Sequence, residues 1–157
     1  MSSFSNPQYM YLFEMKNVWW SIFCVYNRFH EFPLTLCQVL LNLCLNARDA
    51  MPGGGTITLA VDNVEMDEAE ARTLRGGRVG SFLAFTVADT GVGIASENLG
   101  KIFEPFFTTR EGNSTGLGLP TAYGIIKQHA GTIEVESRPG RTEFRLRLPI
   151  AGEDMPG

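Results

Sequence analysis

The chain has 157 residues, of which 44% are hydrophobic and 19% are charged, as expected for one globular domain with its own core. Its formal net charge of −4 argues against a general nucleic-acid-binding protein, because such proteins are normally basic. The three cysteines, Cys24, Cys37 and Cys44, lack the spacing of a metal site and are expected to be buried apolar residues in a reducing compartment.

Residues 1–32 form an aromatic-rich N-terminal segment that the sequence leaves unassigned. Its longest nearly uncharged run, from Asn17 to Asn27, is too short to span a bilayer, so no transmembrane segment is expected in this chain. A signal peptide is not indicated either, because the basic start and the small-residue cleavage site are missing. Two alternatives stay open: a helix that packs on a partner or on the domain, or a poorly specified leader.

Regular patterns begin after this segment and predict a single domain over residues 33–150 and a flexible tail over residues 151–157. Hydrophobic periodicity and glycine or proline signals define its elements. In chain order we expect a helix at 34–50, a strand at 55–64, a polar loop with room for one helical turn, a strand at 80–88, a short helix near 96–102, a loop at 104–115, a helix at 117–129 that stops at Gly131, and a hairpin of the strands TIEVES and TEFRLRLP.

The helix at 34–50 carries an unusual polar stripe beside its broad apolar face. The stripe consists of Gln38, Asn42, Asn46 and Asp49, which fall within an arc of roughly 60° at 100° per residue. A solvated helix face is usually rich in Lys and Glu, whereas this stripe is rich in amides and flanked by leucines. Buried amides need hydrogen-bond partners, so the stripe indicates a polar cavity. The alternative is a helix edge that hydrogen-bonds to neighbouring loops.

Four segments resemble the sequence boxes of a known family. QVLLNLCLNARDAM, DTGVGI, FEPFFTTR and TGLGLPTAYGIIKQHAGTIEVES are similar to the asparagine box, first glycine box, phenylalanine box and second glycine box of sensor histidine kinases. These kinases share a superfamily with gyrase-type, chaperone and mismatch-repair ATPases. The resemblance covers about residues 35–149 and implies the Bergerat fold, an α+β two-layer sandwich. In that fold, helices cover one face of a mixed, mostly antiparallel β-sheet, and ATP lies between the helices and a flexible lid.

In that frame Asp89 is expected to accept a hydrogen bond from the exocyclic amine of adenine. A carboxylate directly at a strand end does not suit a dinucleotide fingerprint, whose acid comes much later, but it suits an amine that donates. Gly91 and Gly93 would let the backbone approach the ring, with Ile94 beside them. The alternative is an acid that caps the short helix after it. The resemblance also makes Thr142 a residue near the base, although the turn before it is one residue shorter than usual.

The resemblance assigns Asn46 as the ligand of Mg²⁺, an ion that prefers oxygen ligands, and Asp49 to the same nucleotide site. Asn42 is the candidate catalytic residue, at the position where hydrolysing relatives carry a glutamate. A glutamate can take a proton from water and an asparagine cannot at neutral pH, which points away from fast ATP hydrolysis.

The loop EPFFTTREGNSTGLGL, from residue 104 to residue 119, is expected to hold the phosphates as a lid. Its helix start offers free amides and a positive dipole end, and its glycines permit tight turns. No GxxxxGK[ST] motif occurs, so a Walker-type loop is not the route to ATP. The expected nucleotide contacts here are Phe107, Thr108, Thr109, Gly116, Leu117 and Gly118, with further donors at Arg110, Ser114 and Thr115 and a further glycine at Gly112. Ser114 departs from the family pattern, which has glycine there.

The two histidines do not settle where a phosphate would go. His129 is expected to be a surface or helix-capping residue near the end of the helix at 117–129. The segment from His30 to Leu36 resembles the phospho-acceptor box of the family with two residues missing. An equally good alignment matches Pro33 and Leu36 with the residues that precede the asparagine box.

The resemblance therefore implies the ATP-binding catalytic domain of a two-component sensor histidine kinase. It would use ATP and Mg²⁺ to transfer phosphate to a histidine on a helical dimerisation domain that is separate or missing, with a response regulator downstream and no nucleic-acid partner. The expected location is cytoplasmic, including the cytoplasmic part of a membrane-associated sensor. The alternatives are a non-catalytic ATP-binding regulator of the same fold and a slow ATPase.

Overall fold

The computed structural model describes residues 9–14, 34–109 and 115–149, with residues 9–14 described as backbone only. The predicted elements between residues 34 and 149 are all present, with ends that differ from the expected ones by a few residues. In chain order they are β1 (Tyr9–Glu14), α2 (Leu34–Asp49), β2 (Thr56–Met66), α3 (Glu68–Thr73), β3 (Gly80–Asp89), α4 (Ser96–Leu99), α5 (Gly118–Gln128), β4 (Thr132–Arg138) and β5 (Arg141–Pro149).

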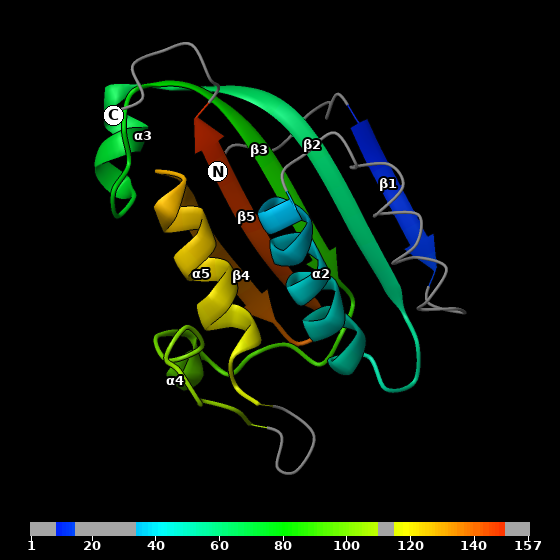
Figure 1. Cartoon of the computed structure of the whole chain (residues 1–157). Helices are drawn as coiled ribbons and strands as arrows, with labels where there is room; N and C mark the ends of the chain where they lie inside the picture. Colours follow the sequence, from blue (N-terminus) through cyan, green and yellow to red (C-terminus); the bar gives the residue numbers. More distant parts are fainter. Residues whose placement is uncertain (1–8, 15–33, 110–114, 150–157) are drawn as a thin grey trace.

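The strands form one sheet in the order β1-β2-β3-β5-β4, and α2 and α5 lie side by side on one of its faces (Figure 1). This arrangement confirms the predicted α+β two-layer sandwich. The expectation of a mixed sheet is not met among the described strands, because their four pairs are all antiparallel. The last residue of β3, Asp89, and an early residue of β5, Thr142, are partners in the strand register, so both lie at the same end of the sheet.

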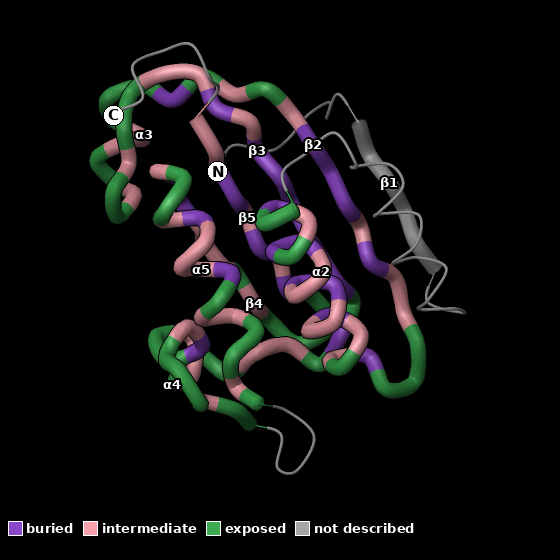
Figure 2. The backbone as a smooth tube through the Cα atoms, in the orientation of Figure 1, coloured by how far each residue is buried: buried purple, intermediate pink, exposed green. Residues whose placement is uncertain are grey.

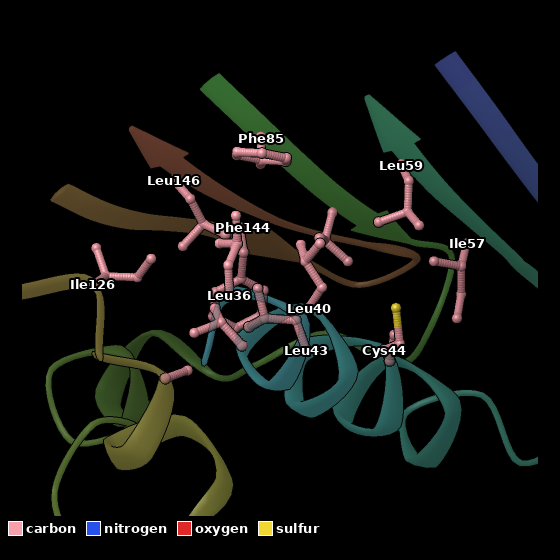
Figure 3. Close-up of a cluster of buried hydrophobic side chains, with 14 of the residues drawn as sticks. Leu36, Leu40, Leu43, Cys44, Ile57, Leu59, Phe85, Ile126, Phe144 and Leu146 are labelled. Carbon is pink, nitrogen blue, oxygen red and sulfur yellow. The ribbon is translucent and has the colours of Figure 1, made fainter. Parts of the chain in front are cut away.

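The hydrophobic core lies between the two helices and the sheet (Figure 3). Figure 2 shows the matching pattern of burial, with purple segments on the inward side of α2 and along the central strands. The predicted apolar face of α2 is the face that packs. Its buried side chains are Leu36, Val39, Leu40, Leu43, Cys44 and Ala47. Burial raises the pKa of the Cys44 thiol to about 12, which fits the expected role of an inert packing residue.

The N-terminal segment contributes a strand to the sheet. Tyr9–Glu14 forms the edge strand β1, antiparallel to β2 with Tyr9 opposite Val61 (Figure 1). The helix alternative is therefore wrong for these six residues, because their backbone extends the ladder of β2. The other residues of the segment, including His30, lie outside the described residues, as does the tail expected at 151–157.

The end of α5 differs in detail from the expected glycine stop. The residue with the left-handed conformation is Ala130, with φ 57°, and the N–H of Gly131 closes the helix end on the carbonyl of Ile126 at 2.9 Å. A Cβ at Gly131 would lie 2.5 Å from the carbonyl oxygen of Arg147, so this glycine serves the close approach to β5. His129 caps α5 and is exposed, as expected.

Among the described residues, no helix is both long enough and apolar enough to cross a membrane.

Packing of α2 on the sheet should carry much of the stability. Leu43 is 0% exposed in the core, so Leu43→Ala should lower the free energy of unfolding by about 2–5 kcal/mol. Leu34 on the same helix is 75% exposed, and Leu34→Ala should change it by less than about 0.5 kcal/mol. Urea denaturation followed by circular dichroism measures both values. Equal losses in the two variants would contradict the orientation of α2.

Candidate functional site

A cavity of about 650 Å³ opens where the C-terminal half of α2 faces the loop after β3 and the start of α5. Its volume lies in the range of small-molecule sites in proteins, roughly 300–1,000 Å³. Segments far apart in the sequence supply its walls: α2, residues between 89 and 109, residues between 115 and 120, and Thr142. The side-by-side packing of α2 and α5 on the sheet brings these segments together (Figure 1).

Asp89 is the last residue of β3 and lines one end of this cavity. Only 4% of it is exposed, and its Oδ1 accepts a hydrogen bond from the N–H of Gly91 at 2.8 Å. Burial raises the pKa of this carboxyl above its ordinary value, while the Gly91 N–H and the charge of Arg141 oppose that rise. Among the described residues no other group donates to this carboxylate, so Oδ2 is available to a donor on a ligand.

Thr142 lies directly opposite Asp89 in the register of β3 and β5 and also lines the cavity. It is 2% exposed, and its Oγ1 lies 2.7 Å from Ser137 Oγ. The short turn between β4 and β5 therefore does not displace this threonine from the site. The turn is held on the loop after β3 by the N–H of Gly140, which donates to the carbonyl of Gly91 at 2.9 Å.

The two glycines of the DTGVGI loop permit close approach, but to neighbouring backbone segments of the protein. A Cβ at Gly93, where φ is +82°, would lie 2.5 Å from the carbonyl oxygen of Arg138. A Cβ at Gly91 would lie 2.6 Å from the carbonyl oxygen of Ala50. Gly93 and Ile94 line the cavity, whereas Gly91 is buried behind it. Glycine at both positions therefore lets the loop sit tightly between α2 and the β4–β5 turn.

The polar stripe of α2 forms the opposite wall of the cavity. Asn42, Asn46 and Asp49 line it as predicted, while Gln38 is exposed and lies outside the lining. Gln38 does not reach the cavity, because the lining of α2 begins at Asn42, about one helical turn later. Asn42 Nδ2 donates to the carbonyl of Gly118 at 3.0 Å and so ties α2 to the first turn of α5.

The segment around the start of α5 lines the third side. Four of its predicted site residues, Phe107, Thr108, Thr109 and Gly116, lie along the cavity with Gly118. Leu117 is 40% exposed, precedes α5 as its N-cap residue and is not part of the lining. Gly118, Leu119 and Pro120 of the first turn of α5 line the cavity, so the positive end of the helix dipole lies next to it, which suits an anion.

Phe106 and Gly116 hold the two ends of the predicted lid together. The N–H of Phe106 donates to the carbonyl of Gly116 at 3.0 Å, and a Cβ at Gly116 would lie 2.6 Å from the carbonyl carbon of Phe106. Phe106 has φ 67°, which is unfavourable for a residue other than glycine, and it is 75% exposed. The predicted lid residues Arg110, Gly112 and Ser114 lie outside the described residues.

The side chains that line the cavity suit a cation that prefers oxygen atoms and takes most of them from a bound small molecule and water, with few from the protein. Asn46 offers an amide oxygen, and Asp49 lies beside it with Oδ1 2.9 Å from Arg48 Nε. No cluster of three or more His, Cys, Asp or Glu side chains that could hold a metal occurs within residues 34–109 and 115–149. Mg²⁺ tolerates such a site, because it commonly takes one or two protein oxygens together with phosphates and waters.

Sequence reasoning missed part of the wall. The missed residues are Leu45, Arg48, Ala50, Pro52, Val92, Ala95, Asn98, Ile102, Leu119 and Pro120. Most are apolar, and a residue that lines a cavity with its apolar side has the same periodicity as a core residue. Leu45 could have been predicted from the sequence, because it lies three residues after Asn42 and so on the same side of the helix.

Comparison with known proteins gives the following matches. Residues 32–152 match the family model described as histidine kinase-, DNA gyrase B-, and HSP90-like ATPase. Sensor kinase CckA of Brucella abortus is 50% identical over 114 residues, which are 71% of this chain and 12% of that protein. Sensory histidine kinase/phosphatase NtrB of Rhodobacter capsulatus is 46% identical over 121 residues, 76% of this chain and 33% of that protein. The chain thus spans a third or less of these relatives.

Solved structures show the same fold. The catalytic domain of histidine kinase ThkA is 25% identical with a TM-score of 0.56, over 90% of this chain and 96% of that one. The mycobacterial sensor histidine kinase MprB is 21% identical with a TM-score of 0.59, over 88% of this chain and 97% of that one, which is a likeness of fold alone.

Replacing Asp89 tests its place in the site. Asp89→Asn keeps an oxygen for the Gly91 N–H but turns an amide N–H₂ toward a ligand amine. We expect ATP affinity to fall roughly 10- to 100-fold, the value of a hydrogen bond to a charged group. Isothermal titration calorimetry measures the affinity. Asp62→Asn, on β2 outside the cavity lining, makes the same charge change and should leave the affinity unchanged.

The same substitution should stabilise the protein without nucleotide. Burial raises the pKa of Asp89 above the ordinary value of 3.8 that it has in the unfolded chain. Ionised Asp89 therefore lowers the free energy of unfolding in full above the raised pKa, and this loss fades as the pH falls from there to 3.8. Asp89→Asn should therefore unfold at a higher temperature than wild type at pH 7, with a smaller difference near pH 4. A variant that is less stable at pH 7 and binds ATP normally would contradict the role of the carboxylate.

Proposed function

This chain belongs to the family of histidine kinase-, DNA gyrase B-, and HSP90-like ATPases, and we propose that it positions Mg-ATP for phosphoryl transfer to a protein histidine. The matched relatives are sensor histidine kinases, so the ATP-binding catalytic domain of such a kinase is the function that the comparisons favour. The acceptor histidine would lie on a helical dimerisation domain, in trans or on another segment, and a response regulator would act downstream.

The observation that carries this proposal is the two-ended cavity. One end holds a buried carboxylate, Asp89, beside the hydroxyl of Thr142, and the other holds the amides of α2 next to the start of α5. A purine with an exocyclic amine suits the first end, because the amine donates to Oδ2. A polyphosphate suits the second end, because the N–H groups of Gly118 and Leu119 at the start of α5 and the threonine hydroxyls there can donate to its oxygens.

Asn46 would be the protein ligand of Mg²⁺, with Asp49 nearby. When bound, Mg²⁺ would neutralise charge on the phosphate oxygens. The described residues of this chain supply the rest by position: Thr108 and Thr109 donate, α5 orients the phosphates, and the apolar wall excludes water. In the transfer, the bond from the γ-phosphorus to the ADP oxygen breaks as a bond to the acceptor nitrogen forms.

Asn42 supports transfer over hydrolysis. Its amide cannot take a proton from water at neutral pH, and its Nδ2 already donates to the Gly118 carbonyl. It would therefore act by fixing the start of α5 against α2, close to the phosphates. This favours the kinase over the slow ATPase. The names of the matched relatives do not favour the non-catalytic regulator, whose mark would be ATP binding without transfer.

The direct test uses γ-labelled ATP and a histidine-bearing hairpin domain from a sensor kinase. Label on the hairpin that is lost in acid supports the kinase, because phosphohistidine is labile there. Rapid release of labelled phosphate without transfer would support an ATPase. Tight ATP binding with neither outcome would support a regulator.

Asn46→Ala should reduce the rate of label transfer at least tenfold, because the metal would lose its protein oxygen. Gln38→Ala is the matched control: it changes another amide of the same helix, but one that is exposed and outside the cavity lining. Its transfer rate should equal that of wild type. Equal rates for Asn46→Ala and wild type at saturating Mg²⁺ would contradict the assignment of the metal ligand.

A further inference from the structure

The sheet has two edge strands, β1 and β4, and the sequence protects only one of them. Among the described strands, β1 pairs with β2 alone and β4 pairs with β5 alone (Figure 1). Each edge therefore has a row of backbone N–H and C=O groups that no described strand pairs. Such a row is a template for a further strand, unless charged side chains, proline or a bulge make pairing unfavourable.

The edge strand β4 carries this kind of protection. Glu134, Glu136 and Arg138 place three charges in a strand of seven residues, and both glutamates form ion pairs with arginines of β5. If two copies of β4 paired antiparallel about Val135, Glu134 of one copy would lie opposite Glu136 of the other. Like charges in opposed positions are destabilising, so β4 is a poor surface for self-association.

The edge strand β1 lacks that protection. Its residues from Tyr9 to Phe13 are uncharged, include three aromatic residues and contain neither glycine nor proline. Glu14 at the end of the strand is its only charged residue. The run is hydrophobic at odd and even positions alike, whereas a strand with one solvated face alternates between apolar and polar residues. This composition is more typical of an inner strand than of an edge.

The sequence of β1 is also complementary to itself. In an antiparallel pair about Tyr11, Tyr9 of one copy lies opposite Phe13 of the other, and the two positions between them are also uncharged. Aromatic residues in opposed positions stabilise antiparallel pairs. The Glu14 residues of the two copies fall at opposite ends of the paired strands, so their charges do not meet.

The same register keeps the two sheets in line. Residues directly opposite each other in antiparallel strands share a face of the sheet. Tyr9 and Phe13 are register partners of Val61 and Ile57, which are buried in the core between the helices and the sheet. Pairing Tyr9 with Phe13 therefore joins the helix-bearing faces of both copies. A slip by one residue would place the helices of the two copies on opposite faces.

We propose that β1 is a dimerisation edge, and that two copies of this chain pair antiparallel through residues 9–13 to join their sheets into one. This contact is separate from the helical dimerisation domain of the proposed function, and it does not depend on what the cavity binds. None of the described residues that line the cavity belongs to β1, so the edge and the cavity use different parts of the chain.

Sedimentation velocity of the wild-type chain measures the association directly. A contact through one short strand is small, so the dissociation constant should lie in the range of roughly 1–100 μM. We expect a shift from monomer to dimer as the concentration rises through this range. A chain that stays monomeric throughout would overturn the proposal. If the chain dimerises but binds no nucleotide, only the function proposed for the cavity is wrong.

Cross-linking tests the register. Tyr11→Cys places two thiols at the centre of the pair, where opposed Cα atoms lie about 4.5–5.5 Å apart, a separation that suits a disulfide. Under mild oxidation this variant should give far more disulfide-linked dimer than wild type, which sets the baseline for the native cysteines. Val135→Cys at the centre of β4 is the matched control and should stay at that baseline. Cross-linking at Val135→Cys alone, equally in both variants or in neither would contradict this interface.

A charge on the edge tests the same contact without a thiol. Leu12 lies opposite Met10 of the other copy in the proposed pair and opposite Thr58 within the chain. Leu12→Lys adds the kind of charge that protects natural edges, so it should raise the dissociation constant at least tenfold. Glu136→Lys on the β4 edge should leave the constant unchanged, and circular dichroism checks that both variants fold. Equal constants for Leu12→Lys and wild type would overturn the role of β1. If Leu12→Lys does not fold, the wild-type association and the Tyr11→Cys cross-link still decide.

Discussion

The site depends on how α2 packs against the sheet. The apolar side of this helix is buried on the central strands, and residues such as Val39 and Leu43 are 0% exposed. Because the helix cannot rotate without exposing them, Asn42 and Asn46 must face sideways, toward α5 and the loop after β3. A hydrophobic constraint thus places polar groups opposite a buried carboxylate. The cavity between them follows from the same packing that stabilises the domain.

The carboxylate at the other end opposes stability. Asp89 is buried with one described hydrogen bond from the protein, and burial raises its pKa. A charge in such a place costs free energy unless a partner supplies further donors. In the proposed function the nucleotide is that partner, so the protein would recover on binding part of what it loses on folding. Ser137 and Thr142 share a hydrogen bond at the same end, with 2.7 Å between their hydroxyl oxygens.

The sequence predicted the elements of the domain well because its helices are strongly periodic and its strands alternate between glycine-rich turns. It also brought together most of the candidate site, since twelve of the fourteen candidate residues line one cavity. The misses have physical causes. Gly91 is buried behind the wall, where its missing Cβ makes room for the Ala50 carbonyl, and spacing cannot distinguish that from contact with a ligand. The β1 strand was missed because an edge strand depends on pairing with β2, which lies more than forty residues away in the sequence.

The most direct test is a crystal structure of the chain with Mg²⁺ and a non-hydrolysable ATP analogue. The account predicts the exocyclic amine of adenine within hydrogen-bond distance of Asp89, about 2.7–3.2 Å, and the metal beside Asn46 with the phosphates at the start of α5. A nucleotide bound outside this cavity, or a base that lies away from Asp89 while the phosphates occupy its end, would contradict it.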